Sequence, residues 1–134
     1  MTVFLDASAL LALHIEGAQR DIVYSQLNTD TQWSACAVAL AESIAAASRL
    51  TDEPVLVRHI EDLLRHTWDF HHVVPLDQAL LDDATELCQR QPVGISAALH
   101  LAAAARLPAP VQYVTFDATQ IPVALSLGFE VVSG

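Results

Sequence analysis

The chain of 134 residues contains no lysine, so all six of its basic residues are arginines. This absence excludes several classes of enzyme, because a phosphate-binding P-loop, a Schiff-base enzyme and a receiver-type phosphorylation switch each require a lysine. Long apolar runs are absent too. Polar residues such as Glu42 and Arg49 interrupt the longest alanine-rich segment before it reaches the roughly 20 residues of a membrane helix. We therefore expect a soluble protein that does not associate with a membrane.

Cysteine is also scarce. Cys36 and Cys88 lie far apart and form no CxxC motif, which indicates reduced core thiols rather than a disulfide framework or a zinc site. The N-terminal residues lead directly into the apolar run Val3-Phe4-Leu5, without the basic segment and cleavage site of an export signal. We therefore expect a cytoplasmic protein.

Positively charged residues are also few. The chain has 16 acidic and 6 basic residues, which gives a formal net charge of -10 at pH 7. This excess of negative charge opposes a broad electrostatic grip on nucleic acid. An enzyme of this composition that acts on nucleic acid therefore needs metal ions.

The length and the 53% hydrophobic content predict one compact domain that spans residues 1–134. Short β-rich runs alternate with longer segments of helical spacing, which is typical of a parallel sheet with helices on both faces. We predict an α/β fold with a central, mostly parallel five-stranded sheet flanked by helices. The predicted strands are residues 3–5, 32–35, 72–75, 112–116 and 129–132, and helical spacing occurs in residues 10–14, 22–27, 38–50 and 55–68.

Two acidic residues directly follow predicted strands. Asp6 follows the first strand and Asp117 the fourth, and ligands of parallel sheets gather at the carboxyl ends of the strands. The alternative interpretation is helix capping, in which Ser8 caps the first helix and Asp117, followed by Gln120, begins a capping box. For Asp117 alone the two interpretations weigh equally. Asp6 points more clearly to a site, since a carboxylate on an apolar strand is costly to bury without a charged or metal partner.

Glu42 is the only charged residue between Asp30 and Arg49, in a predicted helix of small and apolar residues. If it points inward it needs a cation, and if it points outward it is a solvated residue on an alanine-rich helix. Its position alone slightly favours the solvated interpretation. Taken with Asp6 and Asp117, however, it completes a set of oxygen ligands of the kind that holds hydrated Mg²⁺ or Mn²⁺.

Four segments, in this order, resemble the motifs of the PIN domain family, and of VapC-type toxins in particular. Residues 4–10 (FLDASAL) resemble the first motif and residues 39–42 (ALAE) the second. Residues 97–102 (AALHLA) are similar to the third, and residues 115–117 with 128–132 resemble the fourth. The third motif usually begins with an aspartate, where this chain has Ala97. The resemblance spans nearly the whole chain and implies a PIN-like fold.

The resemblance implies a Mg²⁺-dependent endoribonuclease toxin of a VapBC-type toxin-antitoxin module, with Mn²⁺ as an alternative metal. It implies that Asp6 and Glu42 are catalytic metal ligands, and that Asp117 binds or orients the metal or its waters. Ser8 and Thr115 would be supporting polar groups. The expected partners are RNA as substrate, a VapB-like antitoxin and a second copy of the chain in a homodimer.

Ala97 departs from this pattern, because a methyl group can neither ligate a metal ion nor hold one of its waters. We therefore expect impaired cleavage by this chain. The alternative is a catalytically silent PIN module that binds an antitoxin or RNA without cutting. The neighbouring Ser96 could support a water but supplies no negative charge.

The histidines and tryptophans of the chain offer further candidates for a functional site. His100 could act as a general base, but its apolar helix favours a packing role. His71 and His72 do not suggest a metal pair, because adjacent strand residues point to opposite faces. We assign Trp33 and Trp68 to the core.

Haloacid-dehalogenase-like phosphatases share the aspartate after the first strand, but they place a second aspartate where this chain has Ser8, and they need a lysine. Receiver modules also need lysine and have no role for Glu42.

Overall fold

A computed structural model of the chain describes residues 2–28 and 32–134. Its centre is one sheet of five parallel strands in the order β3-β2-β1-β4-β5. The strands are β1 (Thr2–Leu5), β2 (Trp33–Cys36), β3 (His72–Val74), β4 (Val111–Val114) and β5 (Glu130–Val132). The predicted α/β fold with a five-stranded sheet is therefore confirmed, and the predicted strand ends differ from these by only one or two residues.

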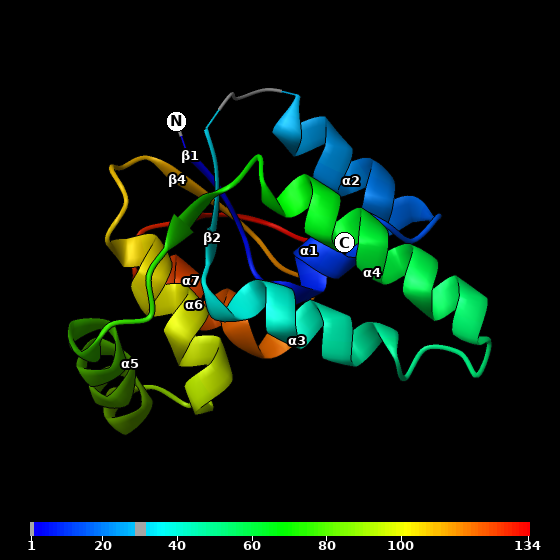
Figure 1. The fold of residues 1–134 in the computed structure, drawn as a ribbon. Helices are drawn as coiled ribbons and strands as arrows, with labels where there is room; N and C mark the ends of the chain where they lie inside the picture. Colours follow the sequence, from blue (N-terminus) through cyan, green and yellow to red (C-terminus); the bar gives the residue numbers. More distant parts are fainter. Residues whose placement is uncertain (1, 29–31) are drawn as a thin grey trace.

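Helices cover both faces of the sheet (Figure 1). One face packs against α1 (Ala7–Ala12), α2 (Ala18–Leu27), α3 (Val38–Ala47) and α4 (Pro54–Trp68). The other packs against α5 (Gln78–Arg90), α6 (Ile95–Ala105) and α7 (Ile121–Ser126), and a short 3-10 helix, η1 (Ala118–Gln120), leads into α7. The sequence patterns above did not single out α5 or α7.

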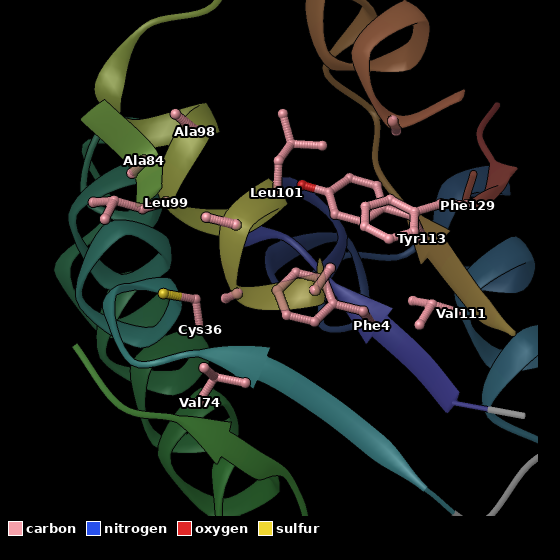
Figure 2. Packing of buried hydrophobic residues seen from close by; sticks show 14 of the residues in the cluster. Phe4, Cys36, Val74, Ala84, Ala98, Leu99, Leu101, Val111, Tyr113 and Phe129 are labelled. Carbon is pink, nitrogen blue, oxygen red and sulfur yellow. The ribbon is translucent and has the colours of Figure 1, made fainter. Parts of the chain in front are cut away.

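The central strand β1 is buried on both faces, as expected for a strand between two layers of helices. Val3 and Leu5 join the core beneath α1 to α4, whereas Phe4 points to the core beneath α5 to α7. Figure 2 shows the second of these cores, in which the rings of Phe4, Tyr113 and Phe129 form a stack. The ring centroids are 5.4 Å apart for Phe4 and Tyr113 and 5.6 Å apart for Tyr113 and Phe129.

Cys36 is buried, Cys88 is partly buried, and both are free thiols, so the predicted absence of a disulfide between them is confirmed. Among the described residues, no helix is both long and apolar enough to cross a membrane.

The end of α1 is joined to α4 through histidine. His14 Nε2 lies 2.8 Å from the hydroxyl of Thr67, and His71 Nδ1 lies 3.0 Å from the Thr67 carbonyl oxygen. His71 also stacks on Trp68, which agrees with the packing role predicted for that tryptophan. Burial, with a contribution from the nearby His71, lowers the pKa of His14 from 6.5 to about 4. Burial also lowers the pKa of His71.

These pKa shifts predict that the fold loses stability in mild acid. Below about pH 6.5 the unfolded chain takes up a proton at His14, while the folded chain does not until about pH 4. We expect His14 to remove on the order of 1–2 kcal/mol of unfolding free energy between about pH 7.5 and pH 5. Urea denaturation at the two pH values measures this loss. His14→Gln should reduce it, whereas His59→Gln, which changes an exposed histidine of α4, should not. Equal losses in the two variants would contradict the assignment.

Candidate metal centre

The carboxyl ends of β1 and β4 are adjacent because the two strands pair in parallel, and Asp6 lies at this edge. Its side chain is only 1% exposed. Oδ1 accepts hydrogen bonds from the Ala9 backbone N–H (2.9 Å) and the Ser8 hydroxyl (2.7 Å), and Oδ2 accepts from the Thr115 hydroxyl (2.6 Å). Three donors therefore offset the cost of burying the carboxylate.

Asp6, and not Ser8, is the N-cap of α1, so the capping role considered for Ser8 is wrong. The reason is that Ser8 already lies inside the first turn, where its hydroxyl faces the neighbouring strand. Ser8 donates to Asp6 and accepts a hydrogen bond of 2.9 Å from the Phe116 backbone N–H. It thus links the residues that follow β1 and β4.

Asp117 is the N-cap of η1, so the capping interpretation is confirmed for this residue. Its Oδ1 accepts from the backbone N–H (3.0 Å) and hydroxyl (2.7 Å) of Thr119. Gln120 Nε2 donates to Asp117 Oδ2 at 3.2 Å rather than forming the reciprocal backbone contact of a capping box. The Gln120 side chain in turn accepts a hydrogen bond of 2.6 Å from the buried Tyr113 hydroxyl. Capping leaves the Asp117 carboxylate partly exposed at the same sheet edge as Asp6.

Thr115 connects the two aspartates. Its side chain is fully buried, and its hydroxyl donates to Asp6 Oδ2 while accepting a hydrogen bond of 3.0 Å from the Asp117 backbone N–H. One hydroxyl therefore links the acidic residues that follow β1 and β4.

Glu42, in α3, points toward α6 and not into solvent, so the solvated interpretation slightly favoured from its position is wrong. Its Oε1 lies 2.7 Å from His100 Nε2, and its Oε2 accepts a hydrogen bond from the Ser96 hydroxyl. The Glu42 side chain is 33% exposed, whereas that of His100 is 2% exposed. His100 is thus a buried packing residue, as predicted, and it also contacts an acid of the candidate site. Sequence reasoning missed Ser96 and His100 as partners of Glu42, although their helical i, i+4 spacing beside Ala97 was an available signal.

Hydrogen bonding lowers the pKa of two of the acids, Glu42 and Asp117. Burial raises the pKa of Glu42, but the contacts with His100 and Ser96 outweigh burial and leave that pKa below its usual value. At Asp117 burial again raises the pKa, but the hydrogen bonds from Thr119 and Gln120 outweigh burial, so this pKa is also lowered. The pKa of Tyr113 is raised well above its usual value by burial and then by the charges of Asp6, Asp117 and Glu42, among others. All three carboxylates therefore lie within electrostatic range of the Tyr113 hydroxyl.

Ala97 lies on α6 between the two residues that hold Glu42. Its side chain is 8% exposed, and it is one helical turn before His100, on the same side of the helix. An aspartate at this position would add a carboxylate beside Glu42, where the chain now has a methyl group.

The remaining residues fit a hydrated Mg²⁺ in charge and donor type. Asp6, Glu42 and Asp117 offer only oxygen ligands, which Mg²⁺ prefers. Within residues 2–28 and 32–134, however, no three histidine, cysteine or acidic side chains are close enough to hold one ion together. Mg²⁺ usually keeps several of its waters and contacts only one or two carboxylates. These residues therefore suit an ion that is held partly through its waters.

A family model described as the PIN domain matches residues 3–124. The chain belongs to the PIN domain family. A comparison with curated proteins found no match.

Solved structures that contain the PIN fold also match. They include a toxin-antitoxin complex from Klebsiella pneumoniae, with a TM-score of 0.68, 17% identity, and coverage of 98% of this chain and 96% of that chain. FitAB bound to the IR36 DNA fragment matches with a TM-score of 0.71, 10% identity and coverage of 98% and 94%. FitAcB from Neisseria gonorrhoeae matches with a TM-score of 0.72, 12% identity and coverage of 97% and 96%. At these identities the likeness shows the fold, which this PIN domain shares over nearly its whole length.

The geometry predicts that Thr115→Val destabilises this PIN domain. The substitution removes the donor to Asp6 Oδ2 and the acceptor for the Asp117 N–H, and it leaves a buried carboxylate oxygen unpaired. We expect a loss of about 1–3 kcal/mol in unfolding free energy, measured by urea denaturation near neutral pH. Thr85→Val is the matched control, because the Thr85 hydroxyl is exposed and bonds only to its own helix. A loss in Thr115→Val no larger than in Thr85→Val would refute the bridging role.

Proposed function

We propose that this chain is a PIN-domain toxin of the VapC type, built to cleave RNA with Mg²⁺ or Mn²⁺ and impaired by Ala97. The observation that supports this most strongly is the arrangement of acids around one sheet edge. Asp6 and Asp117 are joined there through Thr115, and Glu42 is held by α6 beside Ala97. Membership of the PIN family supports nuclease chemistry at this edge.

Asp6, Glu42 and Asp117 would hold the metal in this proposal, at least one of them through the waters of the ion. A bound ion would supply positive charge beside the RNA phosphate and would activate water for attack on it. The other residues position these acids. Ser8 and Thr115 orient the Asp6 carboxylate, and His100 fixes Glu42. Because position 97 offers no carboxylate, the site has less negative charge to retain the ion, which is the physical reason for impaired activity.

The proposal includes an antitoxin partner, a homodimer and a cytoplasmic location. A toxin-antitoxin complex from Klebsiella pneumoniae contains a chain of this fold, which supports an antitoxin for this chain as well. The net charge of -10 suits a partner that brings a basic residue to the acidic edge, because opposite charges speed and orient association.

A second candidate function is a PIN module that binds its antitoxin or RNA without cleavage. The observation in its favour is the position of Glu42, both of whose carboxylate oxygens are engaged by Ser96 and His100. Ala97 lies beside these two residues. Glu42 is held against α6 by the side chains of Ser96 and His100, and a metal ion would have to compete with them for its carboxylate.

Cleavage of a panel of structured RNAs with Mg²⁺ or Mn²⁺ distinguishes the two. We expect Ala97→Asp to cleave at least about tenfold faster than the parent chain, which corresponds to ~1.4 kcal/mol of barrier. Ala97→Asn is the matched control, because it has the same shape without the charge. Metal ions should also raise the melting temperature of Ala97→Asp more than that of Ala97→Asn, because binding to the folded state stabilises it.

Adding Asp6→Asn to Ala97→Asp should remove the regained cleavage, since it takes away a proposed ligand. Equal cleavage by the parent chain and Ala97→Asp would show that position 97 does not limit the site. If neither chain cleaved and neither gained stability from metal, the silent binding module would be the better description.

A further inference from the structure

A cavity of about 600 Å³ opens next to the acidic edge, between α1, the start of α2 and Leu50, which lies in the segment after α3. Its walls include Ser8, Leu11, Glu16, Gln19, Leu50 and Phe116. The volume falls within the range of about 300–1,000 Å³ that is usual for small-molecule sites. The functions proposed above do not use this cavity.

Two residues that line the cavity, Ser8 and Phe116, connect it to the acidic edge. Ser8 lines the cavity and also donates to Asp6 Oδ1. Ser8, Leu11 and Ala12 follow the i, i+3, i+4 spacing of one helix face, so this face of α1 leads from Asp6 into the cavity. On the opposite wall, Phe116 directly precedes Asp117, and its N–H donates to Ser8. A ligand in the cavity would therefore lie beside the proposed reaction site.

The walls of the cavity suit a flat, uncharged group with one polar edge. Leu11, Leu50 and Phe116 form apolar surface. Gln19 and Glu16 provide an amide and a carboxylate that are both exposed. No arginine is among the described residues that line the cavity, and the Glu16 carboxylate disfavours a phosphate group there.

We infer that this cavity binds one unpaired base of the RNA substrate, next to the phosphodiester at the acidic edge; the inference rests on the proposed function. Proteins commonly recognise single-stranded RNA by stacking a base on an aromatic ring and reading its polar edge. Phe116 provides the ring. Glu16 can only accept hydrogen bonds when ionised, so it favours a base that presents an amino group, such as cytosine, over uracil, which presents a carbonyl group at that position.

Binding of short single-stranded RNA to the parent chain tests the inference separately from cleavage, with Mg²⁺ present to offset the negative charge of the protein and with the probes shown to remain intact after the measurement. The probes are fluorescently labelled oligocytidylate and oligouridylate of equal length, measured by anisotropy with the unmodified chain. We expect oligocytidylate to bind at least about fivefold more tightly than oligouridylate. Glu16→Gln should abolish this preference, and Phe116→Leu should weaken binding of both probes at least about fivefold.

The matched control is Phe70→Leu, which changes a phenylalanine that is 63% exposed beyond the end of α4 and should leave binding unchanged. Glu16 and Gln19 are exposed, so Glu16→Gln and Gln19→Ala test the cavity without endangering the fold. We expect Gln19→Ala to weaken the binding of oligocytidylate.

The outcomes separate this inference from the proposed function. Failure of both probes to bind, or equal binding by Phe116→Leu and Phe70→Leu, overturns the base-binding site even if Ala97→Asp cleaves RNA. Binding that depends on Phe116 and Glu16 supports the site even if Ala97→Asp is inactive.

Discussion

The site depends on the burial of one carboxylate. Asp6 is almost completely removed from water, and such a group is tolerated only if donors surround it. Its donors come from two places: the first turn of α1, and Thr115 beyond the end of β4. Satisfying Asp6 therefore sets where α1 begins and how the ends of β1 and β4 align. The position of Asp117 follows from the same hydroxyl, which accepts its backbone N–H.

The sheet and two of the acids could be predicted from sequence because their signals are local. Short apolar strands separated by helical segments indicate a parallel sheet, and an acid after a strand marks its carboxyl edge. The contacts of Glu42 were not predictable in this way. The i, i+4 spacing of Ser96 and His100 places both on one face of a helix, but they are 54 and 58 residues away from Glu42, and only tertiary packing brings them together. The capping role at α1 was considered for Ser8 rather than Asp6 for a different reason. Both residue types cap helices, and a two-residue difference in the start of α1 decides between them.

The alanine at position 97 fits its surroundings because α6 is largely buried and rich in alanine. Eight of its residues are buried, among them Ala98, Leu101 and Ala104. An alanine there continues the apolar surface of the helix, at no cost in burying a charge. In the proposed metal site, Glu42 has Ser96 and His100 as partners, and position 97 supplies no neighbouring acid.

The strand order has a consequence for the order of events during synthesis. Strand β1 is made before the other strands of the sheet and occupies its middle, while its neighbour β4 is made after β2 and β3. Asp6 and Thr115 are separated by 109 positions, so the hydroxyl that completes the Asp6 environment is translated long after the carboxylate. A growing polypeptide cannot assemble the acidic edge early, because contacts of such long sequence separation form only once both partners exist. Until β4 and Thr115 have been made, Asp6 therefore lacks one of its three hydrogen-bond donors and the acidic edge is incomplete.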